Sequence, residues 1–158
     1  MISQRARYAF KALIALSRLP PGDSLQIKDI ADREAIPRSF LEHIMLELKR
    51  NHLAGSRRGR EGGYFLVKRA GDITLGEVLH LIDGPLAPLP CLSRTAYRRC
   101  DDCQDEASCA LRIAFIDVFA ANLAVLDKTT LADVVERSEK AKEGMPGYGA
   151  NPYSGAFI

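Results

Sequence analysis

The stretch 110–126 constrains the fold of this chain more than any other segment. Among its 17 residues only Arg112, Asp117 and Asn122 are polar or charged. Length and composition predict a helix, and a helix that is apolar on nearly every side must be covered on more than one side. A chain of 158 residues has little other protein to provide that cover. We therefore expect a second copy of the chain to pack against the 110–126 helix, in a homodimer.

Hydrophobic residues recur at helical spacing in other parts of the chain. They predict helices over 3–19, 27–34, 37–51, 74–83 and 131–142. Pro37 fits the first turn of the third of these helices, where a missing N–H has no cost. Two short strands, 53–56 and 64–67, flank a loop rich in glycine and arginine, which is typical of a β-hairpin. The expected fold class is mostly α with one small hairpin.

Charge is distributed unevenly along the chain. Residues 1–69 carry 14 Lys and Arg against 7 Asp and Glu, whereas residues 70–158 carry 8 against 13. A basic half joined to an acidic half indicates that a polyanion contacts only one end of the molecule. We find no run of apolar residues that would span a bilayer and no signal peptide, so we expect a cytoplasmic protein with no membrane partner. Nucleotide-binding and hydrolase motifs are also missing, so we do not expect an enzyme.

Three helices followed by a basic hairpin form a winged helix-turn-helix, in which the third helix enters the major groove of double-stranded DNA. Its first residues would face the bases, and the arginines of the hairpin, the wing, would pair with phosphates or enter a narrow minor groove. Glycines there would let the backbone approach DNA closely. The candidate DNA-binding residues are Arg38, Ser39, Phe40, Glu42, His43, Arg57, Arg58, Arg60, Gly62, Gly63 and Tyr64. Alternatively, Phe40 belongs to the core, Glu42 is a surface carboxylate, or the whole unit binds protein.

All four cysteines fall within 91–109, spaced Cys-x8-Cys-x2-Cys-x5-Cys. In a cytosolic chain such clustering favours metal or redox chemistry over a structural disulfide framework. Thiolates are soft ligands that suit iron–sulfur clusters and zinc. The candidate metal ligands are Cys91, Cys100, Cys103 and Cys109. An iron–sulfur cluster is the preferred interpretation; a zinc site, a reversible disulfide, incidental thiols and an electron carrier remain open.

Three segments carry a family resemblance: 36–42 reads IPRSFLE, 53–64 reads LAGSRRGREGGY and 73–78 reads ITLGEV. Together they resemble the Rrf2 family of bacterial winged-helix regulators, over about residues 1–137. The resemblance implies a homodimeric transcription factor on a pseudo-palindromic operator, with the 110–126 helix crossing its twin. It also implies that Ser39, Glu42 and His43 face bases and that Arg58 enters the minor groove.

Family members that sense iron–sulfur status, nitric oxide or iron carry three cysteines that end in Cys-x5-Cys. Cys103 and Cys109 match that ending, and Cys91 is the natural first ligand. Cys100 is an additional cysteine. Other members are controlled by a partner protein. The alternative function is therefore a metal-free or zinc-bearing regulator controlled by thiol oxidation or by a partner.

Two groups of the family complete the cluster with a histidine or an N-terminal aspartate. Arg112 and Arg7 stand at those places in this chain. The resemblance therefore makes Cys100 the fourth ligand of an all-thiolate [4Fe–4S] or [2Fe–2S] cluster.

These inferences divide the chain into four parts. They are a winged helix-turn-helix unit at 1–84, a cysteine-bearing sensor loop at 85–109, a dimerisation helix with a following helix at 110–142, and a flexible tail at 143–158. We expect a repressor, because a small protein without an evident polymerase-contacting segment acts most simply by occlusion. Its affinity for the operator would be tuned by the cluster.

Overall fold

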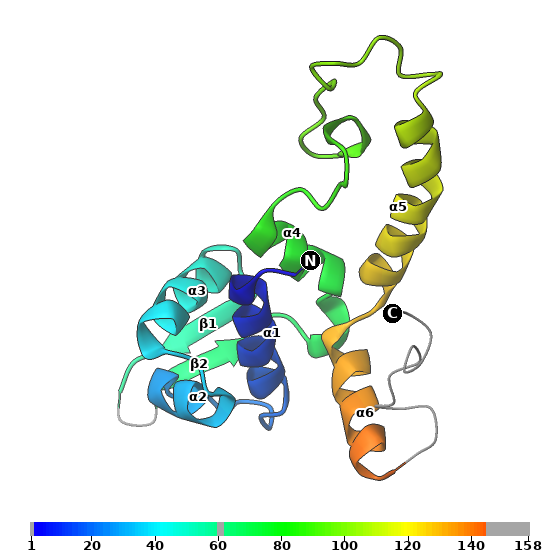
Figure 1. Ribbon diagram of the computed structural model, residues 1–158. Coiled ribbons are helices and arrows are strands. Elements are labelled where there is room, and N and C mark those ends of the chain that lie inside the picture. Colours follow the sequence, from blue (N-terminus) through cyan, green and yellow to red (C-terminus); the bar gives the residue numbers. More distant parts are fainter. Residues whose placement is uncertain (1, 60–61, 145–158) are drawn as a thin grey trace.

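A computed structural model describes residues 2–59 and 62–144 (Figure 1). Over these residues the chain forms six α-helices, two strands and two 3-10 helices. They are α1 (Gln4–Ser17), α2 (Ile27–Glu34), α3 (Arg38–Arg50), β1 (Ala54–Arg57), β2 (Gly63–Leu66), η1 (Ala70–Asp72), α4 (Leu75–Asp83), η2 (Pro90–Leu92), α5 (Ala110–Lys128) and α6 (Leu131–Lys142). The mostly helical fold with one antiparallel hairpin agrees with the fold class expected from the sequence. The predicted tail, 143–158, lies outside the described residues from 145 onward.

Serine and threonine residues set where three of the helices begin. The Ser3 hydroxyl accepts a hydrogen bond from the Ala6 N–H, and Thr74 accepts one from Glu77 in the same way. Thr130 and Asp133 form a complete capping box at the start of α6. Each cap satisfies an N–H that the first turn of a helix leaves without a partner.

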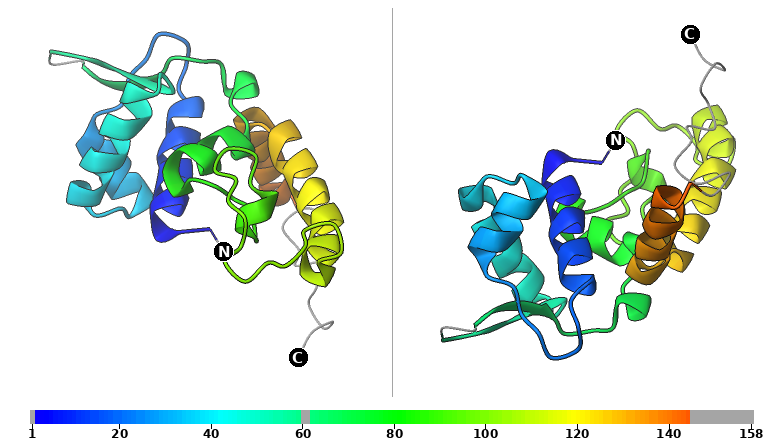
Figure 2. Two further views of the ribbon diagram at one scale, coloured as in Figure 1. Left: turned by 90° about the horizontal axis from the view of Figure 1, so that it is seen from above. Right: turned by 90° about the horizontal axis from the view of Figure 1, so that it is seen from below.

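Helix α1 is the centre of the fold. It contacts α2, α3, α4, α6 and β2. Ala6, Ala9 and Ala12 are fully buried, and their small side chains allow the neighbouring helices to approach closely. Figure 2 shows α2, α3 and the hairpin on one side of α1, and α5 with α6 on the other.

The hairpin pairs Ala54 with Leu66 and Arg57 with Gly63. Its strands are therefore shifted by one residue from the predicted ones. A bridge to the α1–α2 connection fixes the hairpin on the body, since the Leu25 and Tyr64 backbones exchange two hydrogen bonds of 2.9 and 2.8 Å. The wing therefore projects from a held base.

Residues 84–109 and α5 form an arm that extends from the winged-helix half (Figure 1). At the foot of this arm the chain returns to α4, where Leu75 N–H donates to Thr129 and Leu131 N–H donates to Ile73, both at 2.9 Å. None of the helices in residues 2–59 and 62–144 combines the length and hydropathy that a membrane crossing requires.

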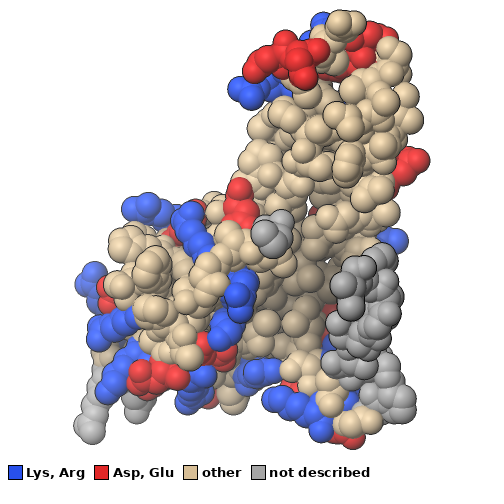
Figure 3. Space-filling view, viewed as in Figure 1, with Lys and Arg blue, Asp and Glu red and all other residues tan. Residues whose placement is uncertain are grey.

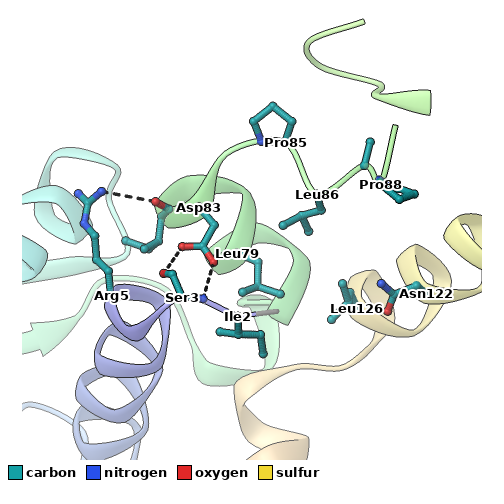
Figure 4. Close-up of a pocket in the computed structure, with 12 residues that line it drawn as sticks. Ile2, Ser3, Arg5, Leu79, Asp83, Pro85, Leu86, Pro88, Asn122 and Leu126 are labelled. Carbon is teal, nitrogen blue, oxygen red and sulfur yellow. Dashed lines mark hydrogen bonds between the residues drawn. The ribbon is translucent and has the colours of Figure 1, made fainter. Parts of the chain in front are cut away.

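A groove of about 960 Å³ lies between α5 and the winged-helix half. Apolar side chains line much of it, and the start of α1 is fastened beside it by Ser3, whose backbone N–H and hydroxyl both donate to Asp83 (Figure 4). Leu126 and Asn122 face the groove from α5. The groove therefore separates part of the arm from the winged-helix half. Backbone hydrogen bonds join the two at the foot of the arm.

Candidate DNA interface and cysteine site

The first turns of α3 carry five of the candidate DNA-binding residues, and all five are exposed: Arg38, Ser39, Phe40, Glu42 and His43. Arg38 Nε donates to Glu42 Oε1 at 3.0 Å, and His43 Nδ1 lies 2.8 Å from the Ser39 carbonyl oxygen. The exposed Arg38–Glu42 ion pair contributes less than about 1 kcal/mol. Arg38 can therefore donate to, and Glu42 can accept from, groups of another molecule.

Phe40 is a large apolar side chain on α3 that is exposed to solvent. Its ring is 63% exposed, so Phe40 is not part of the core. The inward face of the helix is formed instead by Leu41, Ile44, Met45 and Leu48, which are buried. A large exposed apolar side chain beside polar ones is a common feature of a binding surface.

Arg57 and Arg58 are adjacent in the wing but differ in their contacts. Arg57 Nη1 donates to the Gly22 carbonyl oxygen at 2.7 Å, and its guanidinium lies 4.8 Å from the centre of the Phe65 ring. Arg58 is exposed beyond the end of β1. Arg57 therefore holds the wing to the body, and Arg58 projects from it. The third predicted wing arginine, Arg60, lies outside the described residues.

Steric contacts within the protein explain why positions 62 and 63 of the wing are glycine. A Cβ at Gly63 would lie 2.5 Å from the backbone of Leu25, and one at Gly62 would lie 2.5 Å from the Arg57 carbonyl oxygen. Tyr64 is half-buried against the main core. Gly62 thus shapes the turn of the wing, Gly63 and Tyr64 attach it to the body, and the contact of all three with DNA stays a prediction.

Figure 3 shows many Lys and Arg side chains over the winged-helix half, with some Asp and Glu among them, whereas the tip of the arm carries Asp and Glu together with Lys or Arg. Between these regions the arm is almost free of charge on the face shown. The basic excess of the first part of the sequence therefore lies on the half that carries α3 and the wing.

The four cysteines converge on one cavity of about 320 Å³ at the tip of the arm. Cys91 lies on η2, Cys100 and Cys103 lie in the connection to α5, and Cys109 immediately precedes α5. The Cys103 N–H donates to the Cys100 carbonyl oxygen at 3.1 Å, which forms a turn. Cys91 is buried and the other three are half-buried. All four thiols are free.

Cys91 and Cys100 belong to a small apolar cluster with Phe119 and Leu123 of α5. Burial raises the pKa of the Cys100 thiol, and a hydrogen bond with the Cys91 side chain raises it further. These two cysteines therefore pack in one cluster against the helix expected to form the dimer.

Arg112 is a member of this site that the sequence did not identify as functional. Its guanidinium donates to the Cys91 carbonyl oxygen and lines the cavity. A hydrogen bond with the Cys91 side chain raises the pKa of Arg112. Arg112 thus places a fixed positive charge beside Cys91, near the position of the missing histidine.

Polar contacts hold the rest of the loop in shape. Arg99 donates to the Cys103 and Gln104 carbonyl oxygens at 3.0 and 2.6 Å. Asp105 accepts from the Ser108 hydroxyl at 2.6 Å and from the Ala107 N–H at 3.1 Å, and these bonds lower the pKa of Asp105. The cavity therefore has a framework independent of any bound group.

The four cysteines are soft donors of the kind that iron–sulfur clusters and zinc both take. In residues 2–59 and 62–144, no three His, Cys, Asp or Glu side chains are close enough to hold one metal ion. The four thiols nevertheless line one cavity, and the chemistry of this donor set fits either group.

Helix α5 carries a row of apolar side chains that the single chain leaves exposed. Only Phe119 and Leu123 are buried along the described helix. The exposed large apolar residues are Leu111, Ile113, Phe115, Ile116, Val118 and Val125. So many large apolar side chains exposed along one helix are typical of a protein–protein interface.

The family model for Rrf2, described as an iron-dependent transcriptional regulator, matches residues 2–137. The chain belongs to the Rrf2 family. An Rrf2-like helix-turn-helix regulator of Rhodobacter capsulatus is 46% identical over 144 residues, which cover 89% of this chain and 96% of the relative.

Other Rrf2 relatives carry different names. The regulator IscR of Cronobacter sakazakii is 28% identical over 87% of this chain and 82% of its own. Among solved structures, CymR, the global cysteine regulator of Bacillus subtilis, superimposes with a TM-score of 0.71 at 28% identity, covering 86% of this chain and 96% of CymR. This Rrf2 chain is therefore a transcriptional regulator and, like its relatives, not an enzyme.

Proposed function

We propose that this Rrf2 regulator is a homodimeric repressor whose affinity for a pseudo-palindromic operator is tuned by an iron–sulfur cluster. The ligands would be Cys91, Cys100, Cys103 and Cys109. The observation that carries the proposal is the convergence of these four side chains on one cavity at the tip of the arm. When bound, such a cluster supplies sensitivity to redox state, iron supply or nitric oxide.

The DNA-binding part of the proposal rests on the winged-helix half. The exposed first turns of α3 and the projecting Arg58 lie in the basic region of the molecule. A recognition helix reads base edges, and a wing arginine contacts phosphate or a minor groove. Acting in the cytoplasm, where DNA is accessible, the protein would block transcription by occupying the operator.

The dimer part rests on α5. In the single chain, Ile113, Val118 and Val125 are 58%, 62% and 62% exposed. Burying apolar surface contributes roughly 25 cal/mol per Å². Packing the α5 helices of two copies against each other would remove this surface from water and present two copies of α3 to one operator.

The connection between the two parts runs through Phe119 and Leu123. These α5 side chains pack on Cys91, Leu92 and Cys100 of the loop. Reshaping the loop therefore changes the surface on which α5 rests, and the spacing of the two recognition helices depends on α5. This arrangement couples the ligand state of the cysteines to DNA affinity.

Anaerobic purification with iron and acid-labile sulfide analysis tests the proposal. We expect a coloured protein with iron and sulfide in equal molar amounts. The operator is tested with the DNA upstream of the protein's own gene, at matched salt, for the cluster-loaded and cluster-free forms. We expect the two forms to differ in affinity.

Variants sharpen the test. Cys100→Ala should lower the iron content, because it removes one of the four thiolate donors. Thr95→Ala, at an exposed position of the same loop, removes a hydroxyl and no thiol, so it serves as the matched control. A colourless protein without iron or sulfide after anaerobic reconstitution would rule out the cluster. One equivalent of zinc in its place would support the zinc-bearing alternative.

A further inference from the structure

We propose that Cys91 and Cys100 form a reversible disulfide in the cluster-free protein, which makes the cysteine cavity a peroxide-sensitive thiol pair. The pairing itself stands on the geometry of this chain. Only its regulatory consequence rests on the proposed function.

The backbone brings these two cysteines together. The Arg98 N–H donates to the Pro90 carbonyl oxygen at 3.2 Å, which closes the loop between them. Pro90 immediately precedes Cys91, and Arg98 stands two residues before Cys100. Both thiols then pack in the same apolar cluster against α5. The closed loop and the shared cluster therefore bring the two cysteines to the same place on α5.

The two side chains share their surroundings. Both line the same cavity, and Cys100 packs on the apolar cluster to which Cys91 belongs. Cys91 is buried and Cys100 is half-buried, so Cys100 is the member of the pair that a small oxidant in the cavity meets first. The Arg112 guanidinium donates to the Cys91 carbonyl oxygen and so lies beside the pair.

Cys103 is the competing partner for Cys100. The Cys-x2-Cys spacing is common in redox-active pairs, and the turn at Cys100 and Cys103 brings their backbones together. However, Cys103 is not part of the apolar cluster that holds both Cys91 and Cys100 against α5. The packing therefore favours the longer-range pair.

The chemistry balances with hydrogen peroxide as the oxidant. The Cys100 thiolate attacks one peroxide oxygen, the O–O bond breaks, and hydroxide leaves to take up a proton as water. The Cys100 sulfenic acid so formed is attacked by the Cys91 thiolate, the S–S bond forms, and the S–O bond breaks to release hydroxide, which takes up a proton as a second water. Two thiols lose two electrons, and one peroxide gains them.

This disulfide would remove two of the four cysteine ligands. The cavity would then take up no cluster until a thiol reductant restores both thiols. Peroxide exposure would thus keep the cluster-free form of the regulator in place for longer than iron supply alone would dictate.

Peptide mapping tests the pair directly, because the aspartates divide the loop favourably. Cleavage before aspartate releases 83–100, which contains Cys91 and Cys100, and separates it from 102–104 with Cys103 and 105–116 with Cys109. Full-length protein is freed of metal with a chelator, reduced, treated with one equivalent of hydrogen peroxide, alkylated and digested without reduction. We expect 83–100 to be unalkylated and lighter by two hydrogen atoms, with the other two peptides alkylated.

Cysteine variants provide the controls. Cys103→Ser should leave the oxidised 83–100 peptide unchanged, whereas Cys91→Ser and Cys100→Ser should abolish it. A peptide that joins Cys100 to Cys103, or Cys91 to Cys109, would overturn the pairing. Circular dichroism of each variant before oxidation separates loss of the disulfide from loss of folding.

A second measurement separates this inference from the proposed function. Iron uptake is measured for reduced, peroxide-treated and dithiothreitol-restored protein. We expect at least a tenfold loss of uptake after oxidation and full recovery after reduction. If reduced protein binds no iron while the 83–100 disulfide forms, the cluster is wrong and the thiol pair stands. If iron binds and no such disulfide forms, the thiol pair is wrong and the cluster stands.

Discussion

At the scale of single residues, adjacent side chains in the wing have different tasks. Arg57 is engaged with Gly22 and the Phe65 ring, and Arg58 is exposed. The sequence shows only two arginines in a row. The difference arises from the strand register, which sets Gly55 opposite Phe65 and leaves Arg57 diagonal to that ring. Once the register is known, the diagonal position of Arg57 and Phe65 on neighbouring strands would predict their contact.

Replacing Arg58 with alanine should weaken specific DNA binding. We expect a loss of about 1–3 kcal/mol, as for a good arginine contact to bases. Titration of the operator fragment at constant salt measures the effect, with circular dichroism to check the fold. Arg57→Ala is the comparison: it should lower thermal stability as well as affinity. Operator affinity that is unchanged in Arg58→Ala would remove this residue from the interface.

Gly63 makes a prediction about stability. Gly63→Ala would place a methyl group 2.5 Å from the Leu25 backbone, where no flexible side chain can yield. We expect a loss of about 1–3 kcal/mol in the free energy of unfolding, as for overpacking elsewhere. Urea unfolding measures it. Gly71→Ala is the matched control, since a Cβ there meets nothing within 4 Å; an equal loss in both variants would contradict the steric explanation.

At the scale of secondary-structure elements, much of the fold could be predicted from local signals. The predicted α1, 3–19, and the observed Gln4–Ser17 differ by two residues at most at either end, because hydrophobic spacing and the Ser3 cap are local. The strand bounds were off by one residue, since register depends on the partner strand. The short helices η1 and η2 and the Leu25–Tyr64 bridge were missed, because long-range contacts determine them.

The capping box of α6 predicts a pH dependence. Hydrogen bonds from the Thr130 N–H and hydroxyl, both 2.8 Å, lower the pKa of Asp133. A carboxyl whose pKa is lower in the folded state stabilises the fold above its unfolded pKa of about 4. That contribution disappears as the pH falls through the lower, folded value.

Asp133→Asn keeps an acceptor oxygen and removes the charge. We expect the wild type to melt at a higher temperature than this variant at pH 7, with the difference shrinking below about pH 4. Thermal melts from pH 7 to pH 2 measure the difference. Asp32→Asn, at an exposed position on α2, is the control. A difference between Asp133→Asn and the wild type that stays constant with pH would contradict the explanation.

At the scale of the whole molecule, the sequence says more about the exposed apolar surface of the long helix than about the geometry of the cysteine site. An apolar composition on all sides predicts cover from another chain, and the exposed side chains of α5 agree with that need. The packing of Cys91 and Cys100 on Phe119 and the position of Arg112 depend on how the loop folds back on α5. Spacing between cysteines carries no information about that path.

Charge placed on α5 should separate the copies. Val118 is 62% exposed near the middle of the helix, and burying an unpaired carboxylate in an apolar interface is costly. We expect Val118→Asp to sediment as a monomer and to lose most of its operator affinity, with its circular dichroism spectrum retained. Val67→Asp, at a position 53% exposed in the other half of the chain, should sediment like the wild type. A dimer that survives Val118→Asp would place the interface elsewhere.

The paired backbone bonds at the foot of the arm have a mechanical consequence. Because the backbones of Leu75 and Thr129, and of Leu131 and Ile73, are hydrogen-bonded, the end of α5 is fixed to the start of α4. Gly76 brings the two helices still closer, since a Cβ there would collide with the Asp127 carboxylate. A displacement of the far end of α5 is therefore transmitted to α4 without a flexible hinge, and through α1 to α3, the proposed recognition helix.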